Sequence, residues 1–261
     1  MASATRMMEK KRKALETDDR ASWTIPEESP ITSGLNGRER KMPKNLTMIH
    51  TVPGLVGLFT ELCREIMPQV TIYNLVEESL LKNLLEIGQI TPHTNRRVVQ
   101  TILSAKDGGS DAVLVTCSSI GPCVPLARPL CEVPVLRIDD AMAEQAVAVG
   151  RRIGVAATAK TTLKPTADII EEKAREANKE VSVQASLYAE AFQALMRGET
   201  EKHDAIVLEG LKNQEKQGAE VLVLAQASMA RLAPTAAKEI RVPVLTSPRL
   251  AVERARQVLG A

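Results

Sequence analysis

The chain has 261 residues, of which 44% are hydrophobic, 25% are charged and 2% are aromatic. This length suits two domains of about 100–130 residues, each with a sizeable core. The formal charge of +2 and the lack of a basic face in the body argue against nucleic acid as the main partner. No apolar run is long enough to span a membrane. Four cysteines without metal-ligand spacing indicate free thiols in a reducing, cytoplasmic compartment.

Residues 1–44 differ from the rest of the chain. They are dense in charged residues, contain frequent proline and glycine, and have no apolar periodicity. A segment of this composition cannot bury enough apolar surface to order itself. We therefore predict a disordered N-terminal extension over 1–44.

From Leu46 onward, short apolar runs alternate with amphipathic stretches, which predicts parallel sheets covered by helices on both faces. In the first half, helices are expected near 55–67, 95–105, 124–130 and 141–150, the last capped by Asp139 or Asp140. In the second half they are expected near 166–178, 189–217, 230–240 and 248–259. We expect the last helix to return to the first half. The predicted domains are therefore 45–148 together with 248–261, and 149–247.

An internal repeat supports this division into two similar halves. The segment GSDAVLVTCSSIGPCVPLARPLCEVPVLRIDDAMAE begins at Gly109, and its counterpart GAEVLVLAQASMARLAPTAAKEIRVPVLTSPRLAVE begins at Gly218. The two copies align without a gap, so that Cys117 falls on Gln226 and Ser119 on Ser228. Repeats of this kind predict two related half-molecules facing a shared cleft. One turn at the cleft carries a thiol and the other does not.

Polar residues follow several of the predicted strands. Ligands of open parallel sheets bind beyond the carboxyl ends of the strands. The mouth of the cleft is therefore expected to gather His50, Glu77, Glu78, Cys117, Thr158, Gln226 and Ser228.

Cys117 is the strongest candidate for a catalytic residue, because it ends a buried strand and precedes a predicted helix start. Free N–H groups and the positive end of a helix dipole favour a thiolate there. The same N–H groups, around Ser118 and Ser119, bind a carboxylate or an enolate oxygen. The alternative is a small buried hydrophobic residue, the commonest role of a free cysteine. We interpret Cys63, Cys123 and Cys131 as packing residues.

Four segments, VTCSSIGP, LAQASM, HTVPGL and EESLL, resemble the aspartate/glutamate racemase superfamily. This superfamily also includes hydantoin racemases, maleate isomerases and arylmalonate decarboxylases. The resemblance extends from Leu46 to the C-terminus. It implies two flavodoxin-like α/β domains related by a pseudo-twofold axis with a cleft between them, and chemistry that needs no cofactor or metal. In the racemases two facing cysteines, one per half, move a proton at the carbon next to a carboxylate.

The resemblance assigns Cys117 to the first of these cysteines, while Gln226 occupies the second position. An amide does not transfer protons usefully near neutral pH, although it can hydrogen-bond an oxyanion. His50 and Glu78 are candidates for the missing acid or base; alternatively, His50 orients a neighbour and Glu78 caps a helix, as we expect for Glu77. The resemblance also implies that a substrate carboxylate contacts hydroxyls and N–H groups at Thr158, Thr161, Thr162, Ser118, Ser119, Ala227 and Ser228. One of the three threonines is expected only to cap its helix.

Three functional hypotheses remain open. The first is a racemase-type isomerase acting on a small amino acid or carboxylic acid, with Cys117 as one acid/base. The second is a cofactor-free decarboxylase or lyase with one catalytic thiol, or an isomerase in which that thiol is a nucleophile. The third is a binding protein for small carboxylates without turnover. The expected partner is a small carboxylate or amino acid, with no nucleic acid and no membrane, and an assembly of identical copies is compatible with the sequence.

Overall fold

The computed structural model describes residues 44–261. The predicted extension over 1–44, apart from Lys44, lies outside the described residues. Within the described part, no helix is both long and apolar enough to cross a membrane.

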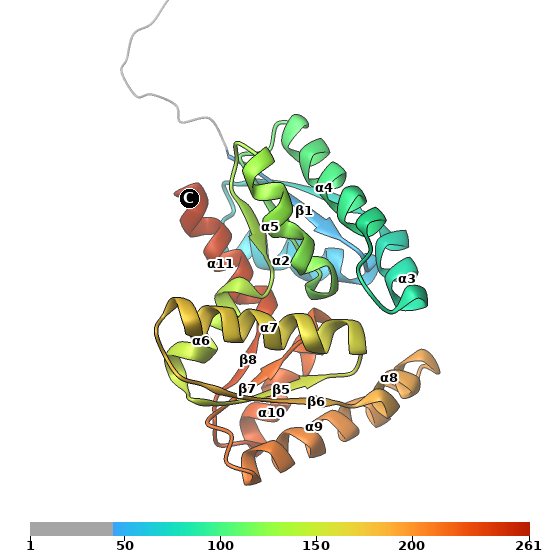
Figure 1. Ribbon diagram of the computed structural model, residues 1–261, viewed down its shortest axis with the longest axis vertical. Helices are drawn as coiled ribbons and strands as arrows, with labels where there is room; N and C mark the ends of the chain where they lie inside the picture. The colour runs from blue at the N-terminus through green and yellow to red at the C-terminus, as the bar shows by residue number, and fades with distance from the viewer. Residues whose placement is uncertain (1–43) are drawn as a thin grey trace, which may run out of the picture. The chain divides into compact units, whose positions relative to one another are not determined.

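Two four-stranded sheets form the framework, and every strand pair in them is parallel (Figure 1). The first sheet has the order β2-β1-β3-β4 and the second β6-β5-β7-β8, so the two halves share one topology. The strands are β1 (Asn45–His50), β2 (Thr71–Val76), β3 (Ala112–Val115), β4 (Val135–Arg137), β5 (Arg152–Ala157), β6 (Ser182–Leu187), β7 (Val221–Leu224) and β8 (Val244–Thr246). The predicted α/β class with parallel sheets is confirmed.

The helices follow the strands in alternation. They are α2 (Val56–Ile66), α3 (Glu78–Ile87), α4 (Pro92–Asp107), α5 (Val124–Ala127), α6 (Asp140–Val149), α7 (Lys160–Glu176), α8 (Ala189–Met196), α9 (Thr200–Lys216), α10 (Ala233–Glu239) and α11 (Ser247–Leu259). Short 3-10 helices, labelled η, are η1 (Pro53–Leu55), η2 (Ser118–Cys123), η3 (Arg128–Leu130) and η4 (Ala227–Leu232).

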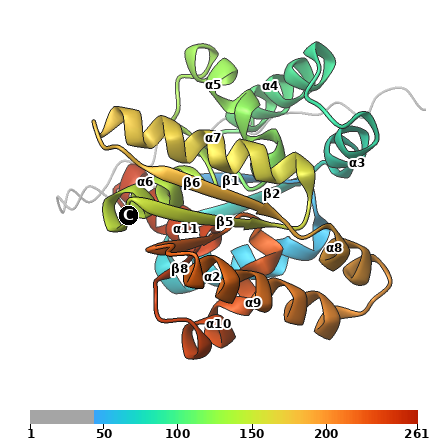
Figure 2. The same ribbon diagram turned by 60° about the horizontal axis from the view of Figure 1, so that its bottom comes forward.

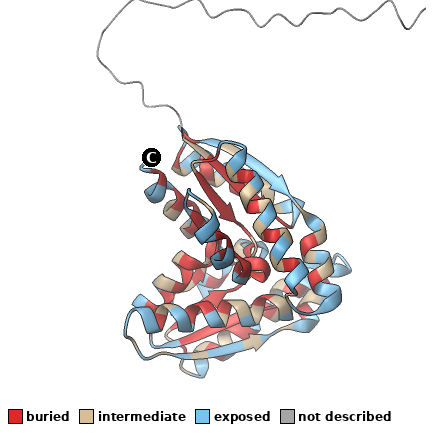
Figure 3. Ribbon diagram, turned by 45° about the horizontal axis from the view of Figure 1, so that its top comes forward, coloured by how far each residue is buried: buried red, intermediate tan, exposed pale blue. Residues whose placement is uncertain are grey.

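Each sheet is buried between helices on both faces, which explains why the central strands β3 and β7 are apolar throughout. Along β3, Ala112 and Leu114 pack toward α2 and α11, whereas Val113 and Val115 pack toward α3, α4 and α5. The same alternation along β7 faces α6 and α7 on one side and α8, α9 and α10 on the other. Figure 3 shows the buried strands at the centre and the exposed outer faces of the helices.

The two halves exchange helices. α6 directly follows the last strand of the first sheet, yet its Met142 and Ala146 belong to the core of the second sheet. α11 follows the last strand of the second sheet, and its Val252 and Ala255 pack into the core of the first. Figures 1 and 2 show α11 beside α2 and α6 beside the second sheet. The domain ranges 45–148 with 248–261, and 149–247, remain a prediction.

The strand register reproduces the internal repeat. Val113 pairs with Val135 in the first sheet, and Leu222 pairs with Val244 in the second. The two pairs differ by the same offset in residue number that aligns Gly109 with Gly218. The turns after β3 and β7, which carry Cys117 and Gln226, are therefore structural counterparts.

Three local expectations were wrong. Helix α7 begins at Lys160 instead of Thr166 and carries Pro165 in its second turn, which removes one N–H bond without ending the helix. The predicted helix over 189–217 is divided into α8 and α9 at Gly198, whose φ of 78° is left-handed. Asp139 stands at the cap position of α6, but its carboxylate binds Arg137 instead of the helix N–H groups.

Candidate active site

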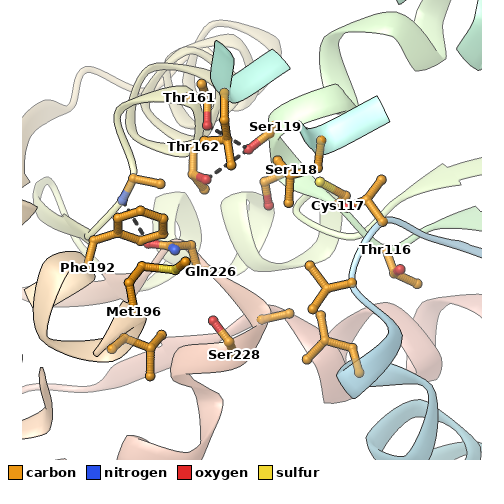
Figure 4. Close-up of a pocket in the computed structure, with 18 residues that line it drawn as sticks. Thr116, Cys117, Ser118, Ser119, Thr161, Thr162, Phe192, Met196, Gln226 and Ser228 are labelled. Carbon is orange, nitrogen blue, oxygen red and sulfur yellow. Dashed lines mark hydrogen bonds between the residues drawn. The ribbon is translucent and has the colours of Figure 1, made fainter. Parts of the chain in front are cut away.

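A cavity of about 310 Å³ lies between the two halves. Its floor consists of the turns that follow β1, β3 and β7 and the start of α7, and its remaining wall comes from α3 and α8 (Figure 4). Its volume is at the lower end of the range for small-molecule sites. The lining residues are Thr51, Val52, Leu55, Leu81, Leu85, Thr116, Cys117, Ser118, Ser119, Ala159, Thr161, Thr162, Phe192, Leu195, Met196, Gln226, Ala227 and Ser228.

Cys117 lines the floor of this cavity, at the extended residue that precedes η2. Burial raises the pKa of the Cys117 thiol and is the largest effect on it. The neighbouring hydroxyls of Thr51 and Ser119 and the N–H groups of Ser119 and Ile120 act in the opposite direction and lower that pKa in part. The expectation of a thiolate favoured by a helix start is therefore wrong. The thiol is protonated at neutral pH and surrounded by groups that stabilise its anion once the proton leaves.

Gln226 occupies the same position in the second half and lies across the cavity from Cys117 (Figure 4). Its Oε1 accepts hydrogen bonds from the N–H of Thr158 at 2.6 Å, the hydroxyl of Thr158 at 3.0 Å and the N–H of Ala159 at 3.3 Å. These N–H donors fix the amide orientation, because Nε2 is not an acceptor. Gln226 therefore closes the turn after β5, and its NH₂ group is the part that can act on a ligand, as a donor.

Hydroxyl groups connect the two halves at the cavity floor. The Ser119 hydroxyl lies 2.9 Å from that of Thr162 and 3.3 Å from that of Thr161, at the start of α7. Ser118 donates to the carbonyl of Ala225 at 3.3 Å. The thiol-bearing turn is thus held against the opposite half by these hydrogen bonds.

Several residues predicted from the sequence do not line the cavity. His50 is fully buried, and its ring nitrogens lie 2.9 Å from Thr116 Oγ1 and 2.9 Å from Asn74 Oδ1. Burial lowers its imidazole pKa, although the Asn74 hydrogen bond acts in the opposite direction. Glu78 is an exposed residue in the first turn of α3.

The remaining predicted polar residues divide between structural and cavity roles. Glu77 caps α3 through the N–H of Ser79, as predicted. Thr158 is buried against Gln226. The cap position of α7 belongs to Ala159, which makes no side-chain bond, so the prediction that a threonine caps this helix was wrong. Ser118, Ser119, Thr161, Thr162, Ala227 and Ser228 do line the cavity.

Cys117 is the single titratable side chain among the described residues that line the cavity. Among residues 44–261, no lysine, arginine, histidine, aspartate or glutamate belongs to the lining. Within residues 44–261, no three His, Cys, Asp or Glu side chains cluster as a metal site would require. The polar chemistry of the cavity is therefore confined to one thiol, one amide, several hydroxyls and backbone N–H groups.

A buried ion pair supports the thiol-bearing turn from behind. Arg137 donates two hydrogen bonds of 3.0 Å to Asp139, and both side chains are almost completely buried. The guanidinium lies so close to Gly121 of η2 that an added Cβ would stand 2.9 Å from Nε. The counterparts of Arg137 and Asp139 in the second half are Thr246 and Pro248, so this support exists only in the half with Cys117.

The side chains of α3 and α8 that reach the cavity were not predicted from the sequence. They are Leu81, Leu85, Phe192, Leu195 and Met196. A signal was available: in both halves an apolar helix begins two residues after the edge strand ends, at Glu78 after Val76 and at Ala189 after Leu187. Because the edge strands end beside the cleft, both helices lie at its mouth.

Comparison with known proteins agrees with this architecture. The family model of Asp/Glu/hydantoin racemases matches residues 56–255, and the chain belongs to this family. Among solved structures, the aspartate racemase of Picrophilus torridus is similar, with 14% identity and a TM-score of 0.64 over 83% of this chain and 94% of that one. The allantoin racemase of Klebsiella pneumoniae is 19% identical, with a TM-score of 0.62 over 83% of this chain and 88% of that one.

An arylmalonate decarboxylase is also similar, with 13% identity and a TM-score of 0.55 over 83% of this chain and 93% of that one. Curated protein sequences give no significant match. At these identities the structural likeness establishes the fold, and the choice of reaction and substrate depends on the cavity itself.

Proposed function

We propose that this chain is a cofactor-independent enzyme that transfers a proton at the carbon next to a carboxylate, with Cys117 as its acid/base. The observation that carries the proposal is that Cys117 is the one titratable side chain among the described cavity residues, with its pKa raised by burial. A protonated thiol beside hydroxyls and N–H groups can donate a proton to a carbanion whose charge resides on a carboxylate oxygen.

The arrangement favours a reaction that needs a proton on one face only. In a decarboxylation, the bond to the leaving carboxylate breaks and carbon dioxide departs. The electron pair stays on the carbon and its remaining carboxylate, and the Cys117 S–H protonates the carbon. Water then reprotonates the thiolate. Gln226, Ser119 and Thr161 supply donors for the oxyanion in this scheme.

Racemisation is the second candidate, favoured by the family model. Inversion requires an acid or base on each face of the carbon, and Gln226 faces Cys117 with its Oε1 already accepting three hydrogen bonds. His50 and Glu78 do not line the cavity, so neither offers a second base in this conformation. The one-face reaction therefore fits the described site better than racemisation.

A substrate screen tests the proposal. Substituted malonates, 2-substituted carboxylic acids and amino acids would be incubated with the full chain while carbon dioxide release and optical rotation are followed. Cys117→Ala should lower any turnover about 10²–10⁴-fold, the usual contribution of a general acid. Cys131→Ala, the same change outside the cavity, should retain the wild-type rate. Turnover that survives in Cys117→Ala would overturn the proposal.

A further inference from the structure

The cavity has two walls of opposite chemistry. The floor holds Cys117, Gln226 and the hydroxyl groups, whereas the side formed by α3 and α8 consists of Leu81, Leu85, Phe192, Leu195 and Met196. We call these five residues the apolar wall. Figure 4 shows Phe192 and Met196 on the Gln226 side of the cavity, away from the hydroxyl cluster.

Two large side chains of the apolar wall are open to solvent. Met196 is 69% exposed and Leu85 is 43% exposed. Both lie at the cavity mouth, one from each half. Each is carried by the helix that follows the edge strand of its sheet, α3 after β2 and α8 after β6. Apolar surface gathered in this way around a cavity marks a binding site, because covering it removes the unfavourable contact with water.

The floor provides for one anionic group of a ligand. Its neutral donors, the Thr161 and Ser119 hydroxyls and the N–H groups at the start of α7, can hold a carboxylate, as helix starts commonly do. On the apolar wall, a charged side-chain group of the ligand, an ammonium or a further carboxylate, would lose its hydration without gaining a counter-charge. Such desolvation without a partner is strongly unfavourable.

From this division we infer the substrate class: a small carboxylic acid whose reacting carbon carries an apolar alkyl or aryl group, which lies against the apolar wall. The inference rests on the proposed function for the position of the reacting carbon. It excludes aspartate, glutamate and other acids with a charged side chain as preferred substrates.

Competition at the thiol tests the inference without requiring turnover. Cys117 would be alkylated with iodoacetamide at pH 9, where more of the thiol is ionised, and its modification followed by peptide mapping. Phenylacetate should halve the alkylation rate at a concentration at least about tenfold lower than aspartate does, since apolar contacts in such pockets discriminate by about 10–200-fold. Equal protection by the two acids, stronger protection by aspartate, or no protection by either would overturn the inference.

A matched pair of variants on α8 locates the effect. Met196→Lys places a cation on the apolar wall, and Gln193→Lys adds the same charge to an exposed residue of the same helix outside the cavity. The preference for phenylacetate over aspartate should fall several-fold in Met196→Lys and stay unchanged in Gln193→Lys. An equal fall in both variants would show a general charge effect and overturn the assignment of the wall.

The two proposals fail in different ways. Protection of Cys117 by phenylacetate without any turnover in the screen would keep apolar carboxylic acids as the class of ligand and remove the enzymatic function. Efficient Cys117-dependent turnover of aspartate would leave the function standing and remove the substrate class.

Discussion

Replacing Gln226 by alanine should destabilise the chain, although Gln226 lines a cavity. Its Oε1 is the common acceptor for the N–H of Thr158, the hydroxyl of Thr158 and the N–H of Ala159, at 2.6, 3.0 and 3.3 Å. Alanine removes this acceptor at the point where β5 meets α7. The cavity would then admit water to some of the three donors, while Thr158 itself stays buried.

The expected loss follows from these bonds. A buried donor left without an acceptor costs about 1–3 kcal/mol, and water from the cavity offsets part of the total. We therefore expect Gln226→Ala to lower the free energy of unfolding by about 2 kcal/mol. For a chain of this size, that loss corresponds to a melting temperature lower by about 4–8 °C.

Thermal and urea melts of the full chain measure this effect, with Gln226→Glu as the matched control. Glutamate keeps an oxygen acceptor at the same place, so it should retain most of the stability that alanine loses. If Gln226→Ala has the same melting temperature as the wild type, or if both variants are equally destabilised, the acceptor role of Gln226 is refuted.

Three further predictions concern the surroundings of the site. At pH 7, iodoacetamide should label the partly exposed Cys131 before Cys117, whose pKa is raised, and peptide mapping that finds Cys117 first would contradict the protonated thiol. Gly121→Ala should cost about 1–3 kcal/mol in urea unfolding, because the methyl group would stand 2.9 Å from Arg137 Nε; an unchanged midpoint would refute this close packing. Burial lowers the pKa of His50 below 6.5, so its contribution to stability is lost as the pH falls from 6.5 toward the lowered value. His50→Gln should therefore make the melting temperature depend less on pH below 6.5. An unchanged pH dependence would refute this contribution of His50.

The internal repeat made the fold predictable to a considerable depth. The gap-free match of Gly109 to Gly218 implied two equivalent strand pairs, and the register of Val113 with Val135 and of Leu222 with Val244 confirms it. Apolar runs located the central strands because they are buried on both faces. From the sequence, α11 was expected to join the first half, but the packing of α6 against the second sheet was not predicted. Nothing in a helix's own sequence states which of two similar cores it joins.

The site was less predictable, because it depends on contacts between segments far apart in the chain. The position of Cys117 at a strand end identified a cavity residue, but the net direction of its pKa depends on how much protein surrounds the sulfur. From the sequence, Gln226 was expected to stand in place of a cysteine and to hydrogen-bond an oxyanion, whereas its bonds to Thr158 depend on the neighbouring strand β5. His50 has the residue type of a base, and only its fully buried position separates a packing role from a cavity role.

The most direct test of a single acid/base at Cys117 is the stereochemistry of proton delivery in heavy water. A substrate found in the screen would be converted in deuterium oxide, and the product analysed for deuterium content and configuration. One deuterium in a single configuration, with Gln226→Cys adding the opposite configuration, is the predicted result. Product of both configurations formed at full rate by the wild type would contradict it, because a second acid/base would then act on the opposite face.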